Sequence, residues 1–190
     1  MDVYSVVFLF FAYSFLGWLG EVLYTAVVHR KYQDRGVLNG PLCILYGIGG
    51  LLVTFALHDL RGGWFFSLVF GAVYATVIEW IAGHILEYAS KTRWWDYSDM
   101  PFNLDGYICL GVSVFWGLLS VITLKWGNPL LLRLFGLLPR GAAVVILWVL
   151  LVLLAIDAVG TLLAMCGLQY RWKAGRRIEN GLANLTVNAG

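Results

Sequence analysis

Four acidic residues of this chain lie inside apolar stretches that are long enough to cross a lipid bilayer. They are Glu21, Glu79, Glu87 and Asp157. On insertion scales, a charged side chain at the centre of a membrane helix costs about 2.5–3.5 kcal/mol. Such a residue normally faces a protein interior or a water-filled cavity and serves a function there. The sequence therefore predicts a membrane protein with a polar interior, and these carboxylates are candidates for binding a substrate or a proton.

The overall composition agrees with a membrane domain. Of the 190 residues, 61% are hydrophobic and 13% are charged, and the mean hydropathy is +0.79. A soluble domain is about one quarter charged. The net charge of +2 does not indicate a nucleic-acid partner. The three cysteines form neither a CxxC motif nor a disulfide framework. We expect residues 1–170 to form one transmembrane domain surrounded by membrane lipids.

Hydrophobic length predicts five spanning helices, because one crossing needs about 20 apolar residues. The predicted spans are Val3–Val28, Pro41–Leu57, Trp64–Tyr88, Gly106–Leu124 and Ala142–Leu168. The segment Asn128–Leu138 is too short to cross alone, and we expect it to lie flat at the interface or to be re-entrant. The expected fold class is an all-α integral membrane bundle of about five helices.

The distribution of Lys and Arg predicts the orientation of these spans. Five spans with the N-terminus outside place nine basic residues on the cytoplasmic side and four outside. Cytoplasmic loops of membrane proteins carry the excess of Lys and Arg. We therefore predict a multi-pass inner-membrane protein whose N-terminus is outside and whose residues 171–190 form a basic cytoplasmic tail.

The sequence also resembles itself at an offset of 66 residues, which predicts an internal repeat of residues 3–58 by residues 69–124. The identical pairs are Gly17 with Gly83, Glu21 with Glu87, Leu38 with Leu104, Gly40 with Gly106, and Cys43 with Cys109. Two spans per repeat give both copies the same orientation, related by an axis along the membrane normal. We expect Glu21 and Glu87 to face each other across this axis. The alternative is a chance similarity between two hydrophobic hairpins.

Small and polar residues recur at helical spacing within the predicted spans. Gly17, Gly20 and Glu21 share one helical face with Tyr13 and Tyr24. A second such face contains Cys43, Gly47, Gly50 and Thr54. Small residues let membrane helices approach closely. We therefore expect these faces to pack against one another and the large apolar side chains to face lipid.

Two polar connections precede the returning helices. In the second of them, Arg93 and Asp96 are three residues apart and can pair. One interpretation is an interfacial aromatic anchor followed by a helix cap. The other is a cytoplasmic mouth above Glu21 and Glu87. The residues of this mouth are Arg35, Asn39, Arg93 and Asp105.

Long motifs in these same segments resemble one family of membrane proteins. They are YSFLGWLGE (Tyr13–Glu21), RGVLNGPLCILYGIG (Arg35–Gly49), EWIAGHILE (Glu79–Glu87), and RWWDYS with FNLDGYICL (Arg93–Leu110). They are similar to the CmpB-type ABC-transporter permease family over about residues 3–124. The resemblance implies a permease subunit. This chain departs from the family pattern at Ile44, where Pro is common, and at Tyr107, where Arg is common.

The sequence lacks the motifs of several nucleotide-binding, hydrolytic and metal sites. It contains no GxxxxGK[ST], so it does not bind ATP through a P-loop, and it contains no GxSxG or HExxH. His84 and Glu87 are the nearest approach to a metal motif, but di-metal bundles use Glu-x-x-His in the opposite order. We expect a hydrogen-bonded His84, no metal and no cofactor.

Three functions remain open at this point. The first is a permease subunit that moves a small solute or protons through a cavity lined by carboxylates, with a separate ATPase subunit or further copies of itself as partners. The second is a membrane enzyme that acts on lipid headgroups at the cytoplasmic face, where paired carboxylates would serve as acid and base. The third is a regulatory or assembly subunit in which the acids are structural.

Overall fold

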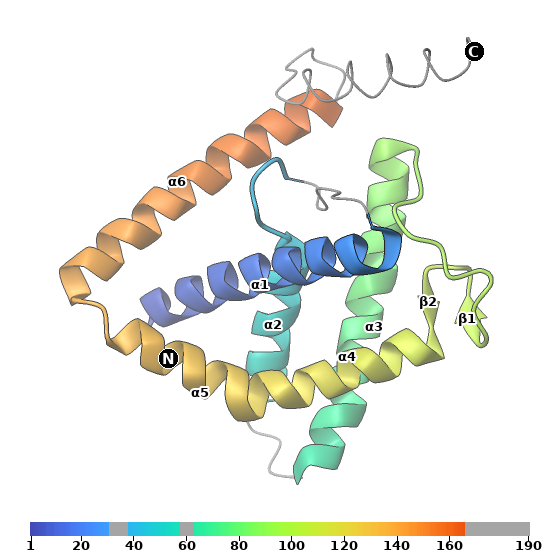
Figure 1. Ribbon diagram of the computed structural model, residues 1–190, viewed down its shortest axis with the longest axis horizontal. Helices are drawn as coiled ribbons and strands as arrows, with labels where there is room; N and C mark the ends of the chain where they lie inside the picture. The colour runs from blue at the N-terminus through green and yellow to red at the C-terminus, as the bar shows by residue number, and fades with distance from the viewer. Residues whose placement is uncertain (31–37, 58–62, 166–190) are drawn as a thin grey trace.

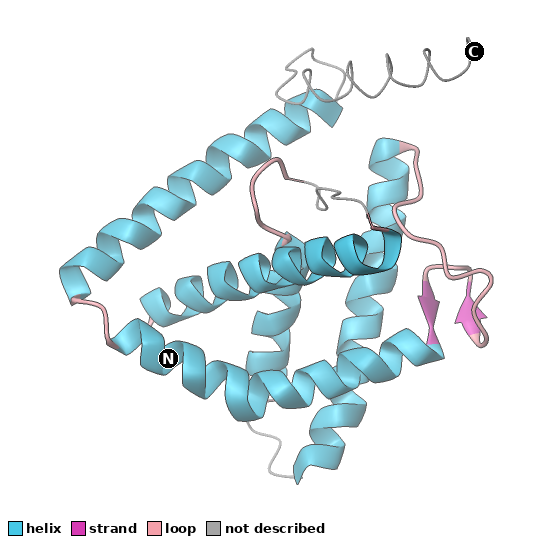
Figure 2. Cartoon of the chain, viewed as in Figure 1, coloured by secondary structure: helices cyan, strands magenta, loops and turns pink. Residues whose placement is uncertain are grey.

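The computed structural model describes residues 1–30, 38–57 and 63–165, most of which are helical (Figures 1 and 2). The elements are, in order, α1 (Val3–His29), α2 (Ile44–Ala56), α3 (Gly63–Ser90), β1 (Asn103–Leu104), β2 (Ile108–Cys109), α4 (Leu110–Ile122), the π-helical turn η1 (Thr123–Gly127), α5 (Asn128–Gly136) and α6 (Arg140–Met165). The two short strands pair antiparallel, with Asn103 opposite Cys109. The chain is therefore an all-α protein, as the sequence predicts.

Four segments of helix are long and apolar enough to cross a membrane. They are Val3–Val28, Gly63–Ala89, Leu110–Gly136 and Arg140–Ala164. The fifth apolar helix, α2, has 13 residues and is shorter than the predicted span Pro41–Leu57. The membrane class is confirmed, with four to five helices that can span. The part of the predicted fifth span after Met165 and the tail 171–190 lie outside the described residues.

The segment after the fourth predicted span differs from our expectation. We expected a separate interfacial or re-entrant segment at Asn128–Leu138, but α4, η1 and α5 form one continuous helix from Leu110 to Gly136. Pro129 has no N–H to donate, and its ring collides with the carbonyl of residue i−4 in a regular α-helix. The wider turn just before it accommodates this ring, with Asn128 N donating to Thr123 O.

Glycines join α1 to α2. A Cβ on Gly50 would lie 2.6 Å from Tyr13 Cδ2, and one on Gly47 would lie 2.8 Å from Phe10 Cδ2. Side chains at these positions would force the two helices apart. The predicted small face of α2 therefore packs against α1, as expected.

The same kind of contact joins α3 to α4. A Cβ on Gly71 would lie 2.5 Å from Ser120 Oγ, and one on Gly117 would lie 2.6 Å from the backbone oxygen of Leu68. Large apolar side chains such as Val73, Phe115 and Ile156 are exposed on the outside of the helices, where lipid tails would cover them. Small residues thus lie at both of these helix contacts, and large apolar side chains cover the exterior.

The remaining helices lie across and beside these two pairs. Figure 1 shows the α4–α5 helix crossing α2 and α3, and α6 at the edge of the molecule. Helix α5 packs on α1, and α6 also contacts α1. The α1–α2 and α3–α4 pairs are the units of the proposed repeat. Their superposition about a membrane-normal axis stays a prediction.

Candidate functional site

Glu79 is the most buried acidic side chain among the described residues, with 5% of its surface exposed. It lies near the middle of α3, a spanning helix. Tyr97 Oη donates to Glu79 Oε1 at 3.0 Å, and Trp116 Nε1 donates to Glu79 Oε2 at 3.0 Å. Tyr97 comes from the connection after α3, and Trp116 comes from α4. Each carboxylate oxygen therefore accepts a hydrogen bond from an uncharged aromatic group.

Glu21 on α1 belongs to the same group of residues. Tyr46 Oη donates to Glu21 Oε1 at 2.6 Å. The ring of Tyr46 packs edge-on against the indole of Trp116, with 5.4 Å between centroids. Because Trp116 also donates to Glu79, a continuous set of contacts joins the two acids. We call Glu21, Tyr46, Glu79, Tyr97 and Trp116 the inner acid cluster.

Tyr97 connects the inner acid cluster to the polar connection outside α3. Burial raises the pKa of Tyr97, so its hydroxyl keeps its proton and acts as a donor. The backbone N–H of Tyr97 donates to Gly106 O at 2.8 Å, which fixes the connection over the helix ends. The connection thus reaches down to a carboxylate about three turns below the end of α3.

A second group surrounds Glu87, near the end of α3. Tyr107 Oη and Arg93 Nε both donate to Glu87 Oε2, at 2.7 and 3.1 Å. Arg93 Nη1 also reaches Asp96 Oδ1 at 3.3 Å and the backbone oxygen of Asp105 at 3.2 Å. We call Glu87, Arg93, Asp96, Asp105 and Tyr107 the outer acid cluster. The predicted Arg93–Asp96 pair is confirmed.

Hydrogen bonds within the outer acid cluster favour the ordinary charge states of its side chains. The hydrogen bond to Glu87 raises the pKa of Arg93, and the hydrogen bonds from Ser98 lower the pKa of Asp96. The hydrogen bond to Glu87 also raises the pKa of Tyr107, which keeps this hydroxyl a donor. All three groups therefore stay in their ordinary charge states at neutral pH.

Glu21 and Glu87 share one local arrangement. In each case a glycine four residues earlier leaves room for a tyrosine ring, and the hydroxyl of that tyrosine donates to the glutamate. A Cβ on Gly17 would lie 2.6 Å from Tyr46 Cδ2, and one on Gly83 would lie 2.6 Å from Tyr107 Cδ1. The repeat predicts the glycines and the glutamates. It does not predict the tyrosines, which are 61 residues apart rather than 66.

Asp157 on α6 binds the connection that precedes α2. Its Oδ1 accepts from the backbone N of Asn39 at 3.0 Å and from Asn39 Nδ2 at 2.9 Å, and its Oδ2 accepts from Gly40 N at 2.7 Å. Thr161 Oγ1 lies 3.4 Å from Oδ1. Two backbone N–H groups and one side-chain amide thus join α6 to the connection before α2. We call Asp157, Asn39 and Gly40 the fastener.

A further polar group lies at the turn η1. Tyr13 Oη donates to Asn128 Oδ1 at 2.6 Å, and Asn128 Nδ2 donates to Thr54 Oγ1 at 3.0 Å. These residues join α1, α2 and α5. Asn128 was not among the predicted site residues, because it begins the segment Asn128–Leu138 that we expected to be interfacial or re-entrant.

The structure divides the predicted site residues into three places. Glu21 and Glu79 lie in the inner acid cluster. Glu87, Arg93 and Asp105 lie in the outer acid cluster, and Asn39 and Asp157 lie at the fastener. Arg35 is outside the described residues. The facing arrangement of Glu21 and Glu87 stays a prediction. Sequence reasoning missed Tyr46, Tyr97, Tyr107 and Trp116. The signal that could have found Tyr46 and Tyr107 is the Gly-x-x-x-Glu spacing, which leaves a ring-sized gap before Glu21 and Glu87.

His84 is hydrogen-bonded, as expected, with its Nδ1 2.9 Å from Trp80 O. Within residues 1–30, 38–57 and 63–165, no three His, Cys, Asp or Glu side chains are close enough together to hold a metal ion.

One comparison with known proteins covers most of the chain. The model of a family described as "Putative ABC-transporter type IV" matches residues 8–162. The match therefore includes both acid clusters and the fastener. No curated protein and no solved structure matches the chain.

Proposed function

Because the chain belongs to this ABC-transporter type IV family, we propose that it is a permease subunit that moves protons or a small cation past the inner acid cluster. The observation that carries the proposal is Glu79, a carboxylate buried in a spanning helix and hydrogen-bonded to Tyr97 and Trp116. Neither of these donors is charged.

The cost of a charge in this position is the physical argument. Two neutral hydrogen bonds offset only part of the cost of removing a carboxylate from water. A bound proton or a bound cation removes the remainder. Residues of this kind mark ion pathways and proton relays in membrane proteins. Glu79 would take up its ligand from the side of Tyr97, and Glu21 would supply the second carboxylate of the route.

A structural role for the cluster is the alternative, since its hydrogen bonds also join α3 to α4 and to the connection above. The variants Glu79→Gln and Glu21→Gln separate the two. Gln keeps the size of Glu and is cheaper to hold in a bilayer. At position 79 its oxygen can accept from Trp116 while its NH₂ group donates to the Tyr97 hydroxyl, and at position 21 either group can bond to the Tyr46 hydroxyl. A purely structural role at these two positions therefore tolerates the change, whereas binding of a proton or a cation does not.

The test is proton flux into proteoliposomes that contain the purified chain, driven by a potassium diffusion potential and read with an internal pH dye. We expect flux from the wild-type chain, little from Glu79→Gln or Glu21→Gln, and normal flux from Asp96→Asn, the matched control in the connection. Infrared spectra provide a second reading that does not need an open pathway. A pH-dependent carboxyl band present in the wild type and absent in Glu79→Gln supports the proposal. The absence of both the proton flux and the pH-dependent carboxyl band would refute the proposal.

We further propose a separate ATPase subunit as the partner, because the sequence has no GxxxxGK[ST] of its own. A homo-oligomer is the competing assembly. Native mass spectrometry of the chain, purified alone and after co-expression with an ATPase encoded beside it, distinguishes these assemblies by mass.

A further inference from the structure

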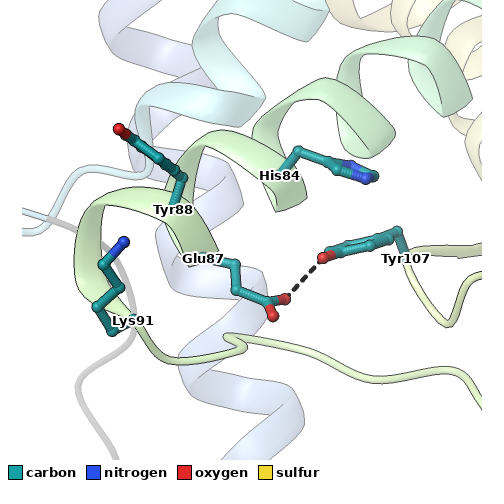
Figure 3. A pocket seen from close by; sticks show the side chains of 5 residues that line it. All are labelled: His84, Glu87, Tyr88, Lys91 and Tyr107. Carbon is teal, nitrogen blue, oxygen red and sulfur yellow. Dashed lines mark hydrogen bonds between the residues drawn. The ribbon is translucent and has the colours of Figure 1, made fainter.

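An open pocket of about 390 Å³ lies at the end of α3 (Figure 3). Its lining residues are His84, Glu87, Tyr88, Lys91 and Tyr107. The apolar span in α3 ends at Ala89, so these residues lie where a spanning helix leaves the hydrocarbon. This is the depth of lipid headgroups.

The cation of the pocket is Lys91, which is positioned by its backbone conformation and by the neighbouring Tyr88 ring. Lys91 has a φ of +56°, and its N–H donates to Glu87 O at 2.8 Å. This is the left-handed position that ends a helix and that usually holds glycine. The ammonium of Lys91 lies 4.5 Å from the centre of the Tyr88 ring, which holds it by a cation–π contact.

The two donors that bind the acid of the pocket share one of its oxygens. Tyr107 and Arg93 both donate to Glu87 Oε2. Arg93 is held by Asp96 and by the backbone of Asp105 in addition to Glu87. Figure 3 shows Glu87 turned toward Tyr107, while Lys91 turns to the side of Tyr88. The pocket therefore presents a carboxylate oxygen and an ammonium on different sides.

We propose that this pocket binds the zwitterionic headgroup of an ethanolamine phospholipid. The primary ammonium of the headgroup donates to Glu87 Oε1, and its phosphate accepts from Lys91 Nζ. The ligand thus carries the same two charges as the pocket, in the opposite arrangement. A choline headgroup has no N–H for Glu87, and a glycerol headgroup has no cation for it. This inference is independent of the transport proposed above.

The test titrates the detergent-solubilised full chain with dioleoyl phosphatidylethanolamine, phosphatidylcholine or phosphatidylglycerol and counts bound lipid by native mass spectrometry. We expect the ethanolamine lipid to bind roughly tenfold more tightly than the other two, the difference expected for one charged hydrogen bond. Equal binding of the three lipids by the wild-type chain overturns the proposal.

Two variants separate the two charges. Glu87→Gln should lower binding of the ethanolamine lipid alone, by roughly tenfold, whereas Lys91→Gln should lower binding of all three lipids, because all three carry phosphate. Wild-type binding by both variants overturns the proposal.

A control variant shows that the effects belong to the pocket. Lys125→Gln removes an exposed cation elsewhere, so it should keep the preference for the ethanolamine lipid. Loss of the preference in Lys125→Gln contradicts the assignment. Free phosphorylethanolamine should compete weakly, because it lacks the acyl chains. Competition as strong as that of the lipid overturns the lipid as the ligand.

Discussion

The fastener between α6 and the Asn39–Gly40 turn gives the sharpest test of how this bundle holds together. In Asp157→Asn, one carboxylate oxygen becomes an NH₂ group. The amide can keep the two contacts to Asn39, but it then presents a donor to Gly40 N–H, whose hydrogen bond of 2.7 Å is the shortest of the three. Loss of one hydrogen bond to a charged group costs about 1.5–3 kcal/mol. We expect the variant to be about 2 kcal/mol less stable, or about 30-fold in the folding equilibrium.

The measurement is reversible unfolding of the purified chain in mixed micelles, together with hydrogen exchange of the backbone. Exchange should rise at Asn39 and Gly40 and along α6, and it should stay unchanged in the α3–α4 pair. Thr161→Val is the matched control, because the contacts of its hydroxyl with Asp157 and Asn39 are long, at 3.4 and 3.3 Å, and it should cost well under half as much. Wild-type stability of Asp157→Asn, or faster exchange spread evenly over the bundle, would refute the reasoning.

Three further predictions concern single groups. Trp116→Phe keeps a ring against Tyr46 but removes the N–H that donates to Glu79. The free energy of unfolding should therefore fall by about 1.5–3 kcal/mol. An unchanged unfolding midpoint would mean that this hydrogen bond contributes nothing to stability. Ser14→Ala removes a fully buried hydroxyl that has no hydrogen-bond partner among the described residues, so the same assay should show stability kept or raised by up to about 1 kcal/mol, and a clear loss would contradict this account. The pKa of Asp96 lies below its usual 3.8, so its support of the connection is complete above about pH 3.8 and is lost as the pH falls through the lower folded-state value. The NMR shift of the Ser98 amide should follow this change and should lose it in Asp96→Asn.

The membrane class and the helix faces could be predicted from the sequence because both depend on local patterns. Apolar length located the spans to within a few residues, as for α1 and α3. The small residues Gly47 and Gly50 indicated the face of α2 that packs on α1. Each of these properties is read from residues within one helix, so no knowledge of the tertiary arrangement was needed.

The arrangement of the polar groups could not be predicted in the same way. Asp157 and Asn39 are 118 positions apart, and nothing local to either residue indicates the other. The tyrosines that donate to Glu21 and Glu87 come from a returning helix in one case and from the preceding loop in the other. The repeat therefore predicted the acids and not their donors. The fourth span was predicted to end at Leu124, whereas a wider turn lets the helix continue to Gly136.

That wider turn also sets the rotational phase of the helix on its two sides. A π turn is in effect one extra residue in an α-helix, and one residue corresponds to about 100° of rotation. With the turn in place, Ser120 on α4 faces Gly71, and Asn128 on α5 faces Tyr13. If the same residues were wound as a regular α-helix instead, α5 would be rotated by about 100° about its own axis and Asn128 would point away from Tyr13. The π turn therefore sets which face of α5 meets α1.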